Sequence, residues 1–242
     1  MTIIYQKKKK TMIYEMTGNI FTTQCSTLVN TVNCSGVMGA GIALECKIRY
    51  PQMYQDYKKR CEQKLLKIGC LDVHEVAKGK LINFPTKDHW RYPSKVEYLT
   101  SGLESFIESY KSLGITSVAF PLLGASNGGI PSETSVEIMK QYLAHCSDIR
   151  VEIWHYDPHT QDDLYPQLQE LFNQHSDQQL CQDSGITKAH IKKIRSRLTD
   201  LEVKSLNALL RTRGIGEASL TKLVRLLNEG EHKITSQLSL FG

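Results

Sequence analysis

Short apolar runs alternate with longer amphipathic runs over residues 11–157, and this alternation predicts an α/β fold. The strand-like runs lie at 12–17, 27–33, 69–76, 80–84, 117–122 and 150–155. The helix-like runs lie at 42–61, 98–113 and 132–144, and Pro51 predicts a break inside the first of them. The pattern favours an α/β sandwich with a mostly parallel, mixed sheet, in which a hairpin near Lys78-Gly79 joins two strands.

Three polar or glycine-rich loops leave the carboxyl ends of predicted strands, at 33–41, 84–91 and 124–129. Ligands of such sheets bind beyond the carboxyl ends of the strands. We therefore expect the three loops to converge on one site.

The first of these loops lies within residues 30–43 and has the order strand, glycine-rich loop, helix start. Its glycines let the backbone approach a ligand closely, and the helix start offers unpaired N–H groups with a partial charge of about +0.5. A diphosphate suits this arrangement. The spacing is neither G-x-G-x-x-G nor G-x-x-x-x-G-K-[ST], which argues against a dinucleotide fingerprint and a P-loop. The simpler alternative is a tight turn that packs a helix on the sheet.

Composition and charge divide the rest of the chain. Residues 11–157 carry 15 basic and 15 acidic side chains, residues 158–183 carry five acids and no Lys or Arg, and residues 184–226 carry ten basic against three acidic side chains. We expect a neutral domain over 11–157, an acidic linker over 158–183 with a short helix near 164–172, and a small basic helical module over 184–230.

The two ends of the chain have their own character. Lys7 to Lys10 are followed by no apolar region, so we expect a disordered basic start over 1–10 and no signal peptide. A flexible tail is expected over 231–242. No apolar run approaches the ~20 residues that span a bilayer, so no membrane partner is expected.

Seven cysteines are scattered along the chain without a C-x-x-C pair. The odd number and the spacing argue against a disulfide framework and against a metal site, and they favour a reducing cytoplasm. No cofactor is expected. Cys34 lies inside the first loop, where a small filling residue is the better interpretation than a nucleophile.

Several segments together resemble a macrodomain. They are Gly18-Asn19-Ile20, Asn30-x-x-Asn33, the loop at 36–43 and the loop at 124–129. The resemblance covers about residues 11–157, and the run Asn-Phe-Pro-Thr-Lys-Asp-His-Trp-Arg at 83–91 narrows it to the DNA ADP-ribosyl glycohydrolase antitoxins of DarT/DarG systems. It implies a three-layer α/β/α fold, ADP-ribose as the ligand, and removal of ADP-ribose from a modified nucleobase.

The resemblance also implies roles for individual residues. Adenine recognition falls to Asn19 and Ile20, and the distal ribose lies against Thr31, Val32, Asn33 and Thr86. The first loop wraps the diphosphate and ribose with Gly36, Val37, Met38, Gly39, Ala40, Gly41, Ile42 and Ala43. The last loop holds the phosphates from the other side with Gly124, Ala125, Ser126, Asn127 and Gly128.

Lys87 is the catalytic residue that the resemblance implies, as a nucleophile at the anomeric carbon of the distal ribose. Without the resemblance, a loop lysine is more simply a solvated charge. Some relatives carry an acidic residue in the loop at 124–129, and this chain has none there, so the general acid must come from elsewhere. Asp88 and His89 are adjacent candidates, although a structural or substrate-contacting role is the better interpretation of each. Trp90 is either a stacking partner for a base or a packed aromatic.

Residues 198–225 predict a helix, a Gly-Ile-Gly turn and a second helix, and they resemble helix-hairpin-helix domains, including the C-terminal domain of the bacterial RNA polymerase alpha subunit. In such hairpins the backbone of the turn meets a DNA phosphate and basic side chains add affinity. The expected DNA contacts are Lys192, Lys193, Arg211, Arg213, Gly214, Gly216 and Lys222. The alternative is a small basic bundle with a solvated face.

The last residues resemble a peptide that binds the bacterial sliding clamp. In this interpretation Leu238, Leu240 and Phe241 anchor in apolar pockets and Gln237 orients the peptide. An apolar tail that packs onto its own domain is the alternative.

The sequence thus predicts an enzyme that removes ADP-ribose from DNA bases, in an antitoxin or repair role. Its expected partners are ADP-ribosylated DNA, an ADP-ribosyltransferase toxin and a sliding clamp. The alternatives are a non-catalytic ADP-ribose reader or toxin-neutralising partner, and a hydrolase of ADP-ribosylated protein. Lys87 favours the enzyme, because a reader has no need of it.

Overall fold

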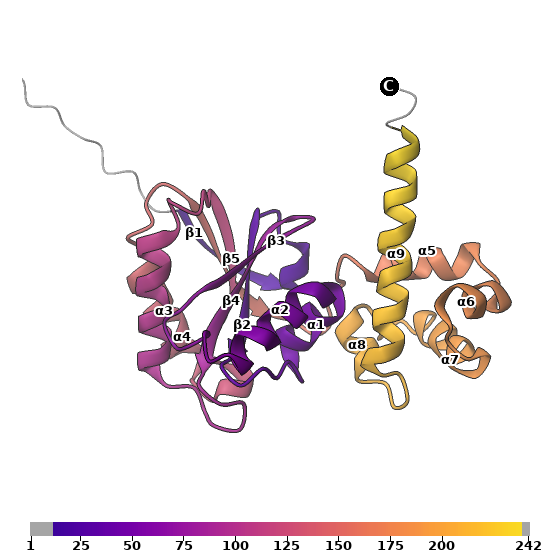
Figure 1. Ribbon diagram of the computed structural model, residues 1–242, viewed down its shortest axis with the longest axis horizontal. Helices are drawn as coiled ribbons and strands as arrows, with labels where there is room; N and C mark the ends of the chain where they lie inside the picture. Colours follow the sequence, from indigo (N-terminus) through magenta and orange to yellow (C-terminus); the bar gives the residue numbers. More distant parts are fainter. Residues whose placement is uncertain (1–11, 239–242) are drawn as a thin grey trace, which may run out of the picture. The chain divides into compact units, whose positions relative to one another are not determined.

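The computed structural model describes the backbone of residues 12–238 and the side chains of residues 12–229 (Figure 1). The chain forms two compact units. The first comprises residues 12–43 and 52–156, and the second comprises residues 44–51 and 157–238. No helix among the described residues is long and apolar enough to cross a membrane.

The first unit is built on a six-stranded sheet with the order β1-β6-β5-β2-β4-β3. All neighbouring strands are parallel except β3 and β4, which form the predicted hairpin. The strands are β1 (Met12–Gly18), β2 (Thr27–Asn33), β3 (Asp72–Val76), β4 (Gly79–Lys87), β5 (Ser117–Pro121) and β6 (Arg150–Tyr156). Strand β4 runs three residues beyond the predicted end, so that Lys87 closes the strand instead of lying in a loop.

Helices cover both faces of this sheet, which confirms the three-layer α/β/α fold (Figure 1). Helices α3 (Val96–Ser109) and α4 (Ser132–Leu143) lie side by side on one face, and α2 (Pro51–Glu62) lies on the other. Helix α1 (Gly41–Arg49) ends two residues before Pro51, as the proline predicts. Two short 3-10 turns, η1 (Ile20–Thr22) and η2 (Ser126–Gly128), follow β1 and β5.

The core between the sheet and α3 is centred on three aromatic rings. Phe106 of α3 meets Phe120 of β5 edge to face at 5.1 Å between ring centroids, and Phe84 of β4 meets Phe120 in the same way at 6.5 Å. Gly102 of α3 lets the helix approach β4, because a methyl group there would lie 2.2 Å from Phe84 Cζ. The packing of Phe84 therefore holds β4 against α3 at a position three residues before Lys87.

The second unit is all helical and has its own apolar core. Its helices are α5 (Tyr165–Gln174), α6 (Asp177–Ser184), α7 (Lys188–Leu198), α8 (Leu206–Leu210) and α9 (Glu217–Leu238). The stretch 158–183, which the composition predicts to be a linker, therefore contains α5 and most of α6. Its few apolar side chains, including Leu168, Phe172 and Leu180, are buried in that core, and their spacing outweighs the hydrophilic average of the segment.

The predicted basic start lies outside the described residues, and so do Leu240 and Phe241 of the predicted clamp-binding peptide. The backbone of α9 continues to Leu238, so the tail expected from residue 231 is helical over its described part. Binding of a clamp stays a prediction.

Arg49 organises a buried ionic cluster within the second unit. Its guanidinium donates to Glu45 Oε1 at 2.7 and 3.0 Å and to Asp163 Oδ1 at 2.7 Å, and it lies 3.5 Å from Asp162 Oδ2. Asp162 in turn accepts from Tyr165 N at 2.7 Å and from Leu206 N at 2.6 Å, so one carboxylate caps the starts of α5 and α8. Three carboxylates share one buried arginine, and burial raises the pKa of Glu45 to about 7.

This raised pKa gives the stability a defined pH dependence. The folded chain keeps a proton on Glu45 that the unfolded chain releases above pH 4.5, so the free energy of unfolding falls as pH rises from 4.5 to 7. We expect the decline in the free energy of unfolding between pH 4.5 and 7 to be smaller by about 3 kcal/mol in Glu45→Gln than in the wild-type chain. Far-ultraviolet circular dichroism during urea denaturation at several pH values measures it. The exposed Glu170→Gln is the control, and an unchanged decline in Glu45→Gln would contradict the assignment.

Candidate functional site

The first glycine loop is held by the side chain of Asn33, at the end of β2. Its Oδ1 accepts from Ser35 N at 3.0 Å, Ser35 Oγ at 2.7 Å and Val37 N at 3.3 Å, while its Nδ2 donates to Val37 O at 2.6 Å. Tyr57 of α2 donates its hydroxyl to Asn33 O at 2.7 Å. Asn33 is buried, and it turns the chain so that Gly36 adopts a left-handed backbone with φ of +80°. The loop is therefore organised before any ligand arrives.

The segment after β4 is tied to this loop through the backbone. Cys34 N donates to Lys87 O at 3.0 Å and to Asp88 O at 3.2 Å, and Trp90 N donates to Ser35 Oγ at 3.3 Å. Burial raises the pKa of the Cys34 thiol to about 12, so the thiol is protonated at neutral pH. This agrees with Cys34 as a filling residue and argues against it as a nucleophile.

The last loop follows β5 and is pinned by Ser94, a residue that the sequence analysis did not single out. Ser94 N donates to Gly128 O at 2.9 Å, and Ile130 N donates to Gly124 O at 3.0 Å. A methyl group at Gly128 would lie 2.5 Å from Ser94 Oγ, so a larger residue there would force the Ser94 side chain to move. Ser94 follows Pro93 shortly before α3 and resembles an ordinary helix-start residue in the sequence, which gave no signal of this contact.

Lys87 lies where the three loops meet. Its Nζ donates to the carbonyl oxygen of Asn127 in the last loop, while its own carbonyl accepts from Cys34 in the first. Asn127 also lies against the start of α1, because a methyl group at Gly41 would be 3.2 Å from Asn127 Nδ2. The predicted convergence of the loops is thus present, with Lys87 at its centre.

The residues expected to bind adenine lie just after β1. Asn19 caps η1 by accepting from Phe21 N at 3.1 Å, and its side chain is 2% exposed. Its Nδ2 is buried and has no hydrogen-bond partner among the described residues. A buried unpaired donor is costly, and a hydrogen bond to an acceptor would remove that cost. Ile20, next to it, is buried.

The remaining predicted ligand contacts divide by exposure. Gly39, Ala40 and Gly41 are exposed at the start of α1, and Val37 is exposed beside them. Met38 and Ala43 have buried side chains, which leaves their backbone as the part that a ligand can meet. Val32 and Thr86 are also buried, and Thr31 and Ile42 are partly exposed.

An exposed aromatic and basic group lies beside Lys87. His89 stacks on Trp90 with 5.9 Å between ring centroids, and the Arg91 guanidinium lies 4.8 Å above the Trp90 ring. Trp90 is 45% exposed and Tyr92 is 66% exposed, so the packed-aromatic interpretation of Trp90 does not hold. Asp88 is exposed too. Within the described residues no three His, Cys, Asp or Glu side chains form a group that could hold a metal ion.

The contacts expected for DNA lie in the second unit. Lys192, Arg211, Arg213 and Gly216 are exposed, and Gly214 adopts a left-handed φ of +81° in the turn before α9. Two of the predicted lysines are used within the unit. Lys222 Nζ donates to Gly185 O at 3.0 Å, and Lys193 Nζ lies against Gly214.

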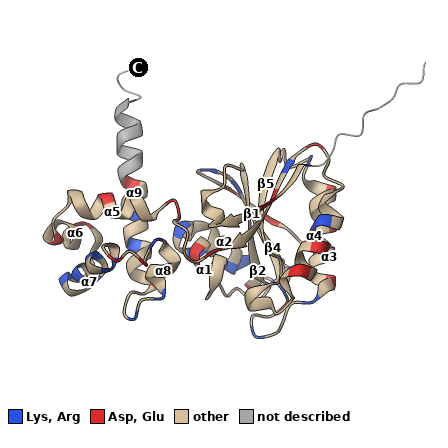
Figure 2. Cartoon of the chain, turned by 180° about the vertical axis from the view of Figure 1, so that it is seen from behind, with Lys and Arg blue, Asp and Glu red and all other residues tan. Residues whose placement is uncertain are grey.

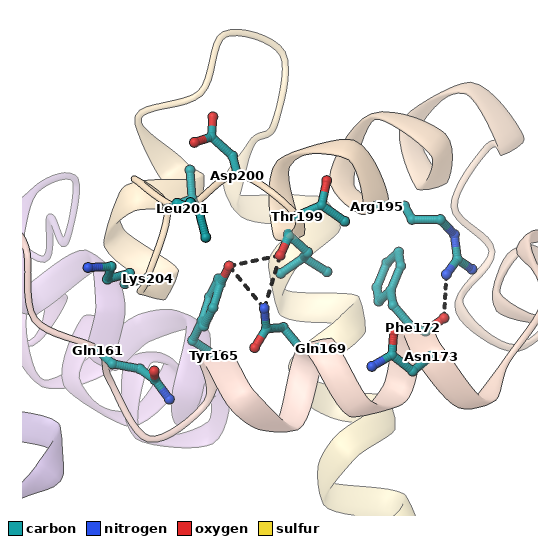
Figure 3. Close-up of a pocket in the computed structure, with 12 residues that line it drawn as sticks. Gln161, Tyr165, Gln169, Phe172, Asn173, Arg195, Thr199, Asp200, Leu201 and Lys204 are labelled. Atoms are coloured by element: carbon teal, nitrogen blue, oxygen red, sulfur yellow. Dashed lines mark hydrogen bonds between the residues drawn. The ribbon is translucent and has the colours of Figure 1, made fainter.

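A cavity of about 320 Å³ also lies in the second unit, between α5 and the segment 195–204 (Figure 3). None of the residues that were predicted for a site lines it. Its polar groups are largely satisfied by each other, since Tyr165 Oη donates to Leu198 O at 2.9 Å and Gln169 Nε2 donates to the same carbonyl at 3.0 Å. Figure 3 shows these groups turned toward one another.

Comparison with known proteins identifies the family of the first unit. The profile of the Macro domain family matches residues 29–139. The macrodomain of Mycobacterium tuberculosis DarG is 40% identical, with a TM-score of 0.58 over 60% of this chain and 97% of that structure. The macrodomain of Thermus aquaticus DarG is 36% identical, with a TM-score of 0.57 over 60% of this chain and 98% of that structure.

The chain belongs to the macrodomain family.

Longer relatives carry the same domain. The DNA ADP-ribosyl glycohydrolase of Thermus aquaticus is 40% identical over 151 residues, and that of Mycobacterium tuberculosis is 45% identical over 147 residues. The match spans 61% and 59% of this chain, but only 41% and 42% of those proteins. A Thermosipho africanus protein named as a fusion of a DNA ADP-ribosyl transferase and a DNA ADP-ribosyl glycohydrolase is 32% identical over 57% of this chain and 40% of its own length. A structure of Thermosipho africanus DarTG in complex with ADP-ribose is 30% identical, with a TM-score of 0.55 over 60% of this chain and 42% of that one.

The role of Asn33 in this macrodomain can be tested through stability. Asn33→Ala leaves the N–H groups of Ser35 and Val37 without their acceptor, so we expect the free energy of unfolding to fall by about 2 kcal/mol. Trp90 and Trp154 both lie in the first unit, so urea denaturation followed by tryptophan fluorescence reports on that unit alone. Asn127→Ala, in an exposed position of the last loop, is the control. Equal stability of the two variants would show that Asn33 does not hold the loop.

Proposed function

We propose that the chain is a hydrolase that removes ADP-ribose from ADP-ribosylated DNA bases, with Lys87 as the nucleophile. The observation that carries this proposal is the position of Lys87, whose Nζ reaches the last loop while its carbonyl is bonded to the first. The relatives named DNA ADP-ribosyl glycohydrolase and the neighbour with bound ADP-ribose support the substrate class.

ADP-ribose fits the polar groups at this end of the sheet. The unpaired Asn19 Nδ2 offers a donor to a ring nitrogen of adenine. The exposed backbone from Gly39 to Gly41 at the start of α1 suits the diphosphate, as does the loop that contains Gly128. The distal ribose would then lie near Thr86 and the end of β4, within reach of Lys87.

The proposed reaction begins with attack of the neutral Lys87 amine on the anomeric carbon of the distal ribose. A C–N bond to Lys87 forms, and the electrons of the N-glycosidic bond leave with the base, which takes up a proton. Water then hydrolyses the new C–N bond, which releases ADP-ribose and restores the lysine. The loop at 124–129 holds no acidic residue, so Asp88 and His89 remain the candidates for donating the proton.

The nucleobase has a place to bind beside the reacting atoms. Trp90 and Tyr92 are exposed, and Arg91 lies over the Trp90 ring. Flat aromatic faces stack on bases of any sequence, and a neighbouring guanidinium attracts the DNA backbone. This exposed group supports DNA rather than protein carboxylates as the carrier of the modification.

The name of one relative supports the proposed partner, and the free cysteines support the proposed compartment. The relative named as a transferase–glycohydrolase fusion supports an ADP-ribosyltransferase toxin as the functional partner. All seven cysteines are unpaired, which supports a reducing, cytoplasmic setting. A non-catalytic ADP-ribose reader that neutralises the toxin by binding is the rival function, and turnover distinguishes the two.

Substitution of the nucleophile tests the proposed chemistry. We expect Lys87→Ala to lower the rate of ADP-ribose release from a modified DNA oligonucleotide by at least about 10³-fold, because a covalent step is lost. Binding of free ADP-ribose, measured by calorimetry, should change less than about tenfold. Lys59→Ala, an exposed lysine on α2, is the control. Turnover at the wild-type rate in Lys87→Ala would rule out Lys87 as the nucleophile, whereas absence of turnover in the wild-type chain would leave the reader as the better description.

We also propose that the hairpin of α8 and α9 binds DNA. Arg211 and Arg213 are exposed in the turn, and a methyl group at Gly216 would meet nothing within 4 Å, so a phosphate can approach the backbone there.

The double variant Arg211→Ala/Arg213→Ala tests this binding. It should lower the affinity of the full chain for unmodified DNA at least tenfold and reduce the slope of log affinity against log salt by about 2. Fluorescence anisotropy over a salt series measures both. Unchanged affinity and an unchanged salt slope would contradict DNA binding by this hairpin.

A further inference from the structure

The segment between β4 and α3, residues 88–95, connects the two glycine loops of the candidate site. Near its start, Trp90 N donates to Ser35 Oγ at 3.3 Å in the first loop. Near its end, Ser94 N donates to Gly128 O at 2.9 Å in the last loop. The backbone that carries the exposed side chains of this segment is therefore anchored at both ends.

Two pairs of an aromatic ring and a cation lie along this segment and the first turn of α3. In the first pair, the Arg91 guanidinium lies 4.8 Å from the centroid of the Trp90 ring. In the second pair, Lys95 Nζ lies 5.6 Å from the centroid of the Tyr98 ring. Arg91, Trp90 and Lys95 are exposed, and Tyr98 is partly exposed. The proposed function uses the first pair for the modified base and leaves the second pair without a role.

Charge alone does not explain this surface. The exposed acids Asp88 and Glu97 balance the charges of Arg91 and Lys95. Figure 2 shows basic and acidic positions interspersed over the first unit. What recurs along the segment is an aromatic ring beside a cation. This combination suits one nucleotide, because the ring can stack on the base while the cation meets the phosphate.

The second pair begins close to the groups that are proposed to react. Lys95 follows Ser94, the residue that bonds the last loop, and the same loop accepts a hydrogen bond from Lys87 Nζ through the carbonyl of Asn127. A nucleotide attached to the modified one therefore has an aromatic and cationic contact available beside the site.

We propose that Lys95 and Tyr98 bind the nucleotide next to the modified one, so that the preferred substrate is a modified base within a DNA strand and not a free modified nucleoside. This inference rests on the proposed hydrolase function and adds a second nucleotide contact to it. A modified nucleoside or a modified protein side chain would leave this contact unused.

The test compares two substrates with the full chain. One is an ADP-ribosylated nucleoside, and the other is a DNA trinucleotide that carries the modified base in its centre, which is short enough to keep any contribution of the helical unit small. We expect kcat/KM of the wild-type chain to be at least about tenfold higher for the trinucleotide, because one more base can stack.

Two variants test the residues themselves. Lys95→Ala/Tyr98→Leu removes the charge and the aromatic face but keeps a large apolar side chain at the start of α3. It should lower kcat/KM for the trinucleotide at least about tenfold and leave kcat/KM for the nucleoside within about twofold. Tyr98→Phe keeps the ring, so it should retain the preference for the trinucleotide.

The control is a lysine that lies over a tyrosine just beyond the other end of α3. Lys111 Nζ lies 5.5 Å from the centroid of the Tyr110 ring, and Lys111 is exposed. Lys111→Ala should leave kcat/KM for both substrates within about twofold.

The outcomes separate the inference from the function on which it rests. Equal kcat/KM of the wild-type chain for both substrates would overturn the inference, while the hydrolase function would stand. An equal loss on both substrates in Lys95→Ala/Tyr98→Leu would show that the pair supports the structure of the site and would also overturn the inference. If the wild-type chain hydrolyses neither substrate, the proposed function itself fails, and the inference fails with it.

Discussion

The carboxamide of Asn33 is the interaction on which the candidate site depends. A loop with a left-handed glycine exposes its backbone N–H groups, and these groups need an acceptor in the absence of a ligand. Asn33 supplies that acceptor from a buried position at the end of β2, and Tyr57 holds its carbonyl from α2. Because Cys34 and Ser35 then bond the segment after β4, the shape of the first loop also sets where Lys87 lies.

Lys87 gains its chemical interest from this placement and not from its residue type alone. The lysine closes β4, and the ring of Phe84 anchors the same strand against α3. Its Nζ reaches the carbonyl of Asn127, so the group that is proposed to attack the sugar is oriented by the loop opposite the first one. Cys34, although it lies within the first loop, is kept protonated by burial and cannot compete as a nucleophile.

The second unit is held together in part by a buried ionic cluster. Three carboxylates lie against the guanidinium of Arg49, and one of them, Asp162, also caps the starts of two helices. Loss of this cluster would therefore leave a buried charge without a partner and helix N–H groups without an acceptor. Lys222 donates to Gly185 O and Lys193 lies against Gly214, while Lys192, Arg211 and Arg213 are exposed. The acidic segment 158–183 and the basic residues of 184–226 thus belong to one helical unit, separate from the α/β unit that is proposed to act on ADP-ribose.

The sequence by itself determined the alternation of strands and helices, the break at Pro51 and the three loops at the carboxyl ends of strands. These features depend on local periodicity and on the positions of glycine and proline. Because ligands of parallel sheets bind beyond the carboxyl ends of the strands, the three loops predict one site. The sequence also determined the charge of each segment. The average composition of 158–183 predicted a linker, because it gave no weight to the few spaced apolar residues through which α5 and α6 pack into the core. Only the tertiary structure decided the strand order, the contact of Ser94 with Gly128, the hydrogen bond of Lys87 to Asn127 and that of Lys222 to Gly185. All of these join residues far apart in the chain, and no local pattern specifies which partner a side chain will meet once the core has formed.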